Sequence, residues 1–139
     1  MNADEPMHRL VWPDEPTIES LGQAVGRAAG FDVVLQPIPP EYRCAYLSGL
    51  TYATTKTAHV FYDDQLSPLL RGQTIMHEYA HLLHGDVEPD SEPLHLRSMF
   101  NDPREHRAEL TGTRLWQALQ RRKSTEDDEL VDFILGKRG

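Results

Sequence analysis

The sequence of 139 residues contains a single cysteine, Cys44, and lacks a long apolar run. One cysteine excludes an intramolecular disulfide and a cysteine-rich zinc site, and it is typical of a reducing compartment. We therefore expect a cytoplasmic protein in which Cys44 is a small strand residue and not a nucleophile. No stretch approaches the roughly 20 apolar residues of a membrane helix, and the first residues do not resemble a signal peptide, so no membrane partner is expected.

Positive charge is also scarce. Lysine and arginine total 14 against 22 aspartates and glutamates, which gives a formal net charge of −8. Because nucleic acids and anionic membranes repel such a surface, direct nucleic-acid binding is not expected. Four of the acids form a run at Asp86, Glu88, Asp90 and Glu92. A run of this kind is typical of a solvated loop.

The most informative motif is His-Glu-Tyr-Ala-His at residues 77–81. Histidines four positions apart lie on one side of an α-helix, where both can reach one Zn²⁺ at about 2.0–2.1 Å. Glu78 directly follows the first histidine, so it can take a proton from a zinc-bound water. The motif thus predicts two metal ligands, His77 and His81, and a general base, Glu78. The alternative is two ordinary polar histidines on a helix, but that helix has no need of the glutamate.

The flanking residues predict that the motif lies inside a helix. Ser67 is a suitable N-cap, Pro68 suits the first helical turn, and Gly85 is a typical stop. Apolar residues recur between them at helical spacing. We therefore expect a helix over residues 69–84 that buries one stripe and turns both histidines toward the same neighbour.

The remaining patterns predict one small domain over residues 15–139, preceded by a flexible segment, 1–14. The other expected elements are a helix at 18–29, strands at 31–36, 45–52 and 57–62, and helices from Pro103 to about 122 and from Ser124 onward. This order predicts an α+β fold, with helices packed on a small three-stranded, mainly antiparallel sheet. The strand at 57–62 is the expected exposed edge, where an extended substrate would pair.

A catalytic zinc needs a third protein ligand and one open position. Glu105 and Glu109 lie four positions apart at the start of the helix after the long loop, so both project from one face. One can bind zinc while the other bonds the second ring nitrogen of a ligand histidine. The alternative is that both are surface charges paired with Arg104 or Arg107.

Such a site predicts hydrolysis of a peptide bond. Zinc lowers the pKa of its bound water to about 7, and Glu78 takes the proton as the water attacks the carbonyl and passes it to the leaving amine. A second donor to the oxyanion is expected. The candidates, between which the sequence does not choose, are His84, His95, His106 and Tyr62.

Residues 74–85, Thr-Ile-Met-His-Glu-Tyr-Ala-His-Leu-Leu-His-Gly, resemble the active-site helix of the ImmA/IrrE family of zinc metallo-endopeptidases. Many members read I-x-H-E-x-x-H-L-L there and carry a second block, E-x-E-A-N-x-F-A. That block starts here at Glu105, with Arg107 on its middle acid, Glu109 on its asparagine and Gly112 on its second alanine. The resemblance implies a zincin-like, gluzincin-type fold with Zn²⁺ on His77, His81 and Glu105.

The same resemblance implies that Glu109 contacts one of the metal ligands without binding the metal itself. If Glu105 is not the third ligand, Glu109 is the alternative. It further implies that the substrate is a protein such as a helix-turn-helix regulator. The sequence itself has no convincing helix-turn-helix, so any regulation is expected to act through protein contact.

Two other functions stay open. One is a non-catalytic, pseudo-protease module that binds a partner as a regulatory or toxin–antitoxin component. The other is a zinc hydrolase of a small molecule. A long groove would favour a peptide substrate, and a closed pocket would favour a small one.

Overall fold

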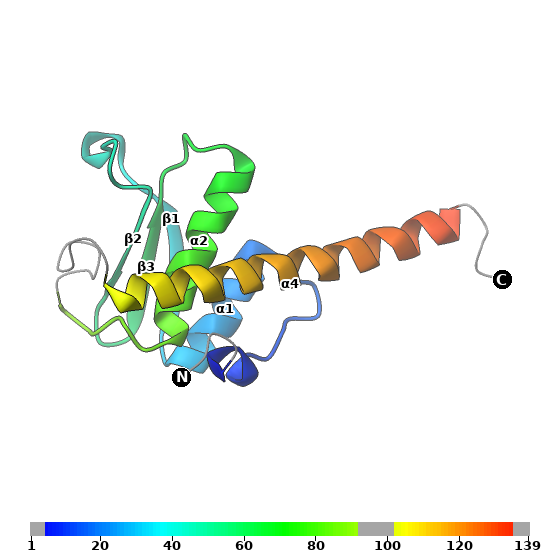
Figure 1. Cartoon of the computed structure of the whole chain (residues 1–139), viewed down its shortest axis with the longest axis horizontal. Coiled ribbons are helices and arrows are strands. Elements are labelled where there is room, and N and C mark those ends of the chain that lie inside the picture. The colour runs from blue at the N-terminus through cyan, green and yellow to red at the C-terminus, as the bar shows by residue number, and fades with distance from the viewer. Residues whose placement is uncertain (1–4, 92–101, 135–139) are drawn as a thin grey trace.

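The computed structural model describes residues 5–91 and 102–134, with side chains for 6–91 and 102–123. It confirms a small three-stranded sheet packed against helices (Figure 1). The elements in chain order are η1 (Glu5–Arg9), α1 (Ile18–Ala29), β1 (Asp32–Pro37), η2 (Pro40–Tyr42), β2 (Gly49–Ala53), β3 (Thr57–Tyr62), α2 (Pro68–Leu83) and α4 (Pro103–Ile134).

The sheet has the strand order β1-β3-β2. β2 and β3 form the expected antiparallel hairpin, but β1 runs parallel to β3, so the sheet is mixed and not mainly antiparallel. The prediction that β3 is an exposed edge is wrong, because β3 lies in the centre. Within the described residues the edges are β1 and β2. The segment 38–48 connects β1 to β2 and leaves room between them for β3. The residue pattern of a strand does not indicate which strands lie beside it.

Helices α1 and α2 begin and end where the capping residues indicate. At α1, the side chain of Thr17 accepts a hydrogen bond from the backbone of Ser20, and Gly30 ends the helix with a φ of 88°. At α2, Ser67 accepts from the backbone of Leu70. Both helices agree with prediction to within one residue at each end.

Two predicted features of the chain are wrong. Residues 103–134 form one continuous helix, α4, without the expected break at Ser124. No glycine or proline interrupts the chain there, and ordinary residues cost a helix less than about 0.7 kcal/mol each. Cys44 lies exposed in the loop before β2, because that strand starts at Gly49 and not at residue 45.

The core lies between the sheet and the helices, and α2 runs through its centre. This helix packs against α1, β2, β3 and most extensively α4, whose first half crosses it before the rest extends outward (Figure 1). The fully buried Tyr79 of α2 donates a hydrogen bond to the carbonyl of Ile18 in α1. The motif helix is therefore held on several sides, which fixes the direction of its histidines.

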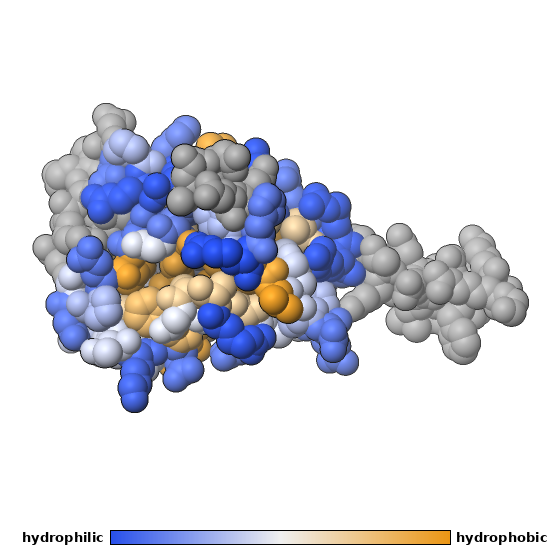
Figure 2. Space-filling view, turned by 90° about the horizontal axis from the view of Figure 1, so that it is seen from below, coloured by the Kyte–Doolittle hydropathy of each residue, from blue (hydrophilic) through white to orange (hydrophobic). Residues whose placement is uncertain are grey.

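The face seen in Figure 2 carries a hydrophobic area near its centre, bordered by hydrophilic side chains. Among the residues that the structure describes, no helix combines the length and apolar character that a bilayer crossing requires.

Candidate metal centre

Three side chains converge at the crossing of α2 and α4. Oε2 of Glu105 lies 2.8 Å from Nε2 of His77 and 3.0 Å from Nε2 of His81. The ligand atoms of the three residues all lie within 4.8 Å of one another. These residues are therefore close enough together to hold a metal ion. The spacing of the motif predicted the histidine pair, and the family resemblance implied Glu105 as the third member.

The convergence depends on how closely α4 approaches α2. A Cβ atom at Gly112 would lie 3.0 Å from both the Cα and the backbone nitrogen of His77. On the same interface, a Cβ atom at Gly72 would lie 2.2 Å from the ring of Trp116. Two glycines thus allow the helices to touch, and this contact brings the first turn of α4, with Glu105, over the histidines.

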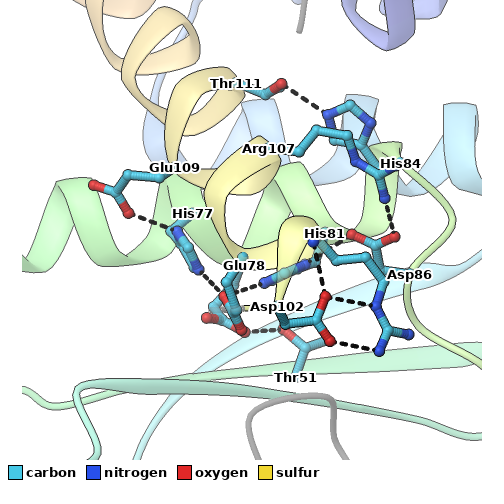
Figure 3. A network of polar contacts seen from close by, with 12 residues as sticks. Thr51, His77, Glu78, His81, His84, Asp86, Asp102, Arg107, Glu109 and Thr111 are labelled. Atoms are coloured by element: carbon cyan, nitrogen blue, oxygen red, sulfur yellow. Dashed lines mark hydrogen bonds and ion pairs between the residues drawn. The ribbon is translucent and has the colours of Figure 1, made fainter. Parts of the chain in front are cut away.

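His81 is held from behind by a buried carboxylate. Its Nδ1 lies 2.9 Å from Oδ2 of Asp86, whose other oxygen accepts a hydrogen bond from Arg107 of α4 (Figure 3). Asp86 is only 7% exposed. The expectation that it belongs to a solvated acidic loop is therefore wrong: Asp86 orients the imidazole and directs its Nε2 toward Glu105.

The other histidine has its own carboxylate. Oε2 of Glu109 lies 2.9 Å from Nδ1 of His77, an ion-pair contact whose angles do not make an aligned hydrogen bond (Figure 3). Glu109 is largely exposed, whereas Glu105 lies between the two imidazoles. The two glutamates, one turn apart, thus occupy different positions: Glu105 at the converging ring nitrogens and Glu109 at the outer nitrogen of His77.

The carboxylates control protonation of the site. Burial disfavours the imidazolium of His81, but hydrogen bonds to Asp86 and Glu105 outweigh it and raise the pKa of His81 to about 9. Burial opposes protonation of His77 too, and the bond to Glu105 leaves its pKa raised. The same two histidines lower the pKa of Glu105. Without a metal, protons therefore occupy the nitrogens at which a metal ion would bind.

Glu78 points into the protein beside the histidines and is 8% exposed. Thr51 of β2 donates a hydrogen bond of 2.8 Å from its hydroxyl to Oε1 of Glu78 (Figure 3). This contact holds the carboxylate in one orientation. The sequence carries no local signal for Thr51, because it comes from a strand that precedes the motif by many residues.

The four residues expected as possible oxyanion donors do not all lie near the site. His106 lines a hollow together with His77 and Glu105. His84 instead contacts the hydroxyl of Thr111 at 2.8 Å and lines a separate hollow near the N-terminal segment. Tyr62 packs against the hydrophobic core. His95 lies outside the described residues.

Two open hollows flank the site and share His77 and Glu109. One has a volume of about 270 Å³ and extends past Glu78 along α2; the other, of about 490 Å³, lies over the start of α4. The site is thus reached from two sides along one surface.

Comparisons with protein-family models, with curated proteins and with solved structures gave no match. The likeness to a family therefore depends on the motif residues alone.

Proposed function

We propose that this protein is a zinc-dependent endopeptidase of the H-E-x-x-H type, similar to the ImmA/IrrE family, that acts on a protein in the cytoplasm. The observation that carries the proposal is the convergence of His77, His81 and Glu105 beside a buried, oriented Glu78. A structural metal site would have no use for that glutamate.

The donor set favours zinc in a catalytic role. Two imidazoles and one carboxylate are a known ligand set of catalytic zinc, whereas structural zinc sites have four protein ligands. Within the described residues, no fourth histidine, cysteine or acid joins the cluster. When bound, zinc supplies Lewis acidity that polarises a substrate carbonyl and acidifies a water molecule.

The protein residues handle the proton. Thr51 holds the carboxylate of Glu78 in place, and this carboxylate takes a proton from the attacking water. Glu78 then gives the proton to the nitrogen of the leaving amine. Glu78 is only 8% exposed and lines the open hollow at the site, so a bound substrate would displace the water around its carboxylate.

Access to the site favours a peptide over a small molecule. The two hollows are open and meet at His77 and Glu109, as an extended chain requires. β2 replaces β3 as the strand that would pair with substrate, since β2 is an edge in the described structure. Its first residue, Gly49, lies against α2: a Cβ there would be 3.4 Å from Cγ of Glu78. By resemblance, a helix-turn-helix regulator is the proposed substrate.

The test is the Glu78→Gln variant, assayed for zinc content and for cleavage of a candidate protein substrate. The change keeps the shape of the side chain and its acceptor for Thr51 but removes the base. We expect unchanged zinc content and a loss of cleavage by about 10²–10⁴-fold. Glu88→Gln, at an exposed acid in the loop after α2, is the matched control and should cleave normally.

Full activity of Glu78→Gln would refute hydrolysis by this mechanism. If the cellular effect of the protein persists in that variant while cleavage is absent, the protein is a partner-binding module instead.

A further inference from the structure

The smaller hollow beside Glu78 has features of a side-chain pocket. We propose that it binds a lysine or arginine side chain of the substrate, at a residue next to the bond that is cut. The inference rests on the proposed peptidase function and adds the substrate class.

The position of this hollow follows from helical spacing. Its lining residues on α2 recur every three to four positions, so they form one stripe on the helix surface. The stripe starts at the general base, Glu78, and runs toward the N-terminal end of α2. Those residues are Leu70, Gln73, Thr74, His77 and Glu78. Ser48 closes the β2 side and Glu109 the α4 side. A substrate chain that places its carbonyl at the metal centre would therefore direct a neighbouring side chain into this stripe.

The size of the hollow suits one side chain. Its volume is about 270 Å³. Whole small-molecule sites commonly measure about 300–1,000 Å³. The hollow therefore has room for one long side chain, and the adjoining hollow of about 490 Å³ is left for other parts of the substrate.

The lining combines an apolar wall with a carboxylate. Leu70 is 51% exposed, so its side chain is available to a passing methylene chain. Glu109 is the exposed acid, and its contact with His77 uses only one of its oxygens. Lysine and arginine bury an apolar stem while keeping a charged tip in contact with water or a counter-ion, which fits this pair of walls.

The charges around the hollow favour a positively charged side chain of the substrate. A divalent ion is offset by the carboxylates of Glu105 and Glu78, so Glu109 leaves the loaded site with one net negative charge. No lysine or arginine lines either hollow at the site within the described residues. The positive end of the α2 dipole is felt mainly within its first turn, so it does not cancel Glu109. The net charge of −8 acts in the same direction.

The first experiment uses the full chain loaded with zinc and a pool of peptides with randomised sequence. Products are sequenced by mass spectrometry. We expect lysine and arginine to be enriched at one position beside the cut by at least about fivefold over glutamate, the effect of a charge-assisted contact at a partly exposed site. Cleavage without this enrichment overturns the inference and leaves the peptidase function standing. Absence of all cleavage overturns the peptidase function itself.

The second experiment neutralises the net negative charge of the hollow. Gln73→Lys adds a positive charge on its wall, and Gln117→Lys makes the same change at an exposed site of α4 that lines neither hollow. We expect Gln73→Lys to lower kcat/KM for basic peptides and raise it for acidic ones, with zinc content unchanged. Gln117→Lys should keep the original preference. Equal effects of both variants would contradict a local pocket.

The third measurement does not depend on turnover. Fluorescent peptides methylated at the nitrogen of the bond that is cut are titrated with zinc-loaded protein, with lysine, norleucine or glutamate at the selected position. The inference requires the order lysine, then norleucine, then glutamate in affinity. Equal binding of lysine and norleucine would show that the charge contributes nothing and would overturn it.

Discussion

At the scale of single residues, the sequence motif predicted His77, Glu78 and His81, but not the buried acid behind His81. His77, Glu78 and His81 are local in sequence, so a five-residue pattern suffices to place them on one helix face. Asp86 and Arg107 act across elements, and only the folded chain brings them together. Asp86 did carry a usable signal, an acid just after the glycine stop and five residues beyond His81. It was hidden by the neighbouring acids Glu88 and Asp90, which are exposed.

Removing the carboxylate behind His81 should weaken metal binding. In Asp86→Asn the amide no longer stabilises the Nδ1 proton as an anion does, and Arg107 loses its partner. We expect the affinity for zinc to fall by about 10–100-fold, measured by competition with a chromophoric chelator.

The control is Glu88→Gln, an exposed acid two positions further on, which should bind zinc as the parent does. An unchanged affinity in Asp86→Asn would mean that this buried acid only stabilises the fold.

At the scale of elements, capping residues predicted where the helices end. The alternation of apolar residues did not predict which strands pair or in which direction. The caps act locally. Thr17 and Ser67 accept hydrogen bonds from the first turn of their helices, and Gly30 adopts the positive φ that ends α1. The parallel pairing of β1 with β3 is not local, and nothing in either strand encodes it. The Ser124 cap signal failed because a serine caps a helix only where other residues also end it.

The contact between α2 and α4 should be sensitive to one methyl group. Gly112→Ala places a Cβ 3.0 Å from the backbone of His77, and backbone cannot move aside as a flexible side chain can. We expect a loss of about 1–3 kcal/mol in the free energy of unfolding. Zinc affinity should fall as well, because Glu105 moves away with α4.

Chemical denaturation and the chelator competition test both parts, with Gln117→Ala on the exposed side of α4 as control. A stable Gly112→Ala protein with normal zinc affinity would show that the close approach is not what positions Glu105.

At the scale of the whole molecule, the metal-free protein should depend on pH in a defined direction. The pKa of His81 is raised from 6.5 to about 9, so its contribution to folding is complete below about pH 6.5 and lost as pH rises through about 9. The pKa of Glu105 is lowered from 4.5, so its contribution is lost in acid. We expect the metal-free protein to lose stability between pH 6.5 and 9.

Zinc affinity should rise over the same range, because the metal displaces these protons. Thermal unfolding with a chelator, compared with the zinc-loaded protein, measures the effect from pH 5 to 9.5. Metal-free protein that becomes more stable from pH 6.5 to 9 would contradict the proton network.

The central claim is that one metal ion joins α2 to α4 through His77, His81 and Glu105. The most direct measurement is an anomalous-difference map, recorded at the zinc edge from crystals grown with zinc. The account predicts a single strong peak at about 2.0–2.2 Å from Nε2 of both histidines and from a carboxylate oxygen of Glu105. Imidazoles that point apart, or a peak whose carboxylate ligand is absent, would contradict it.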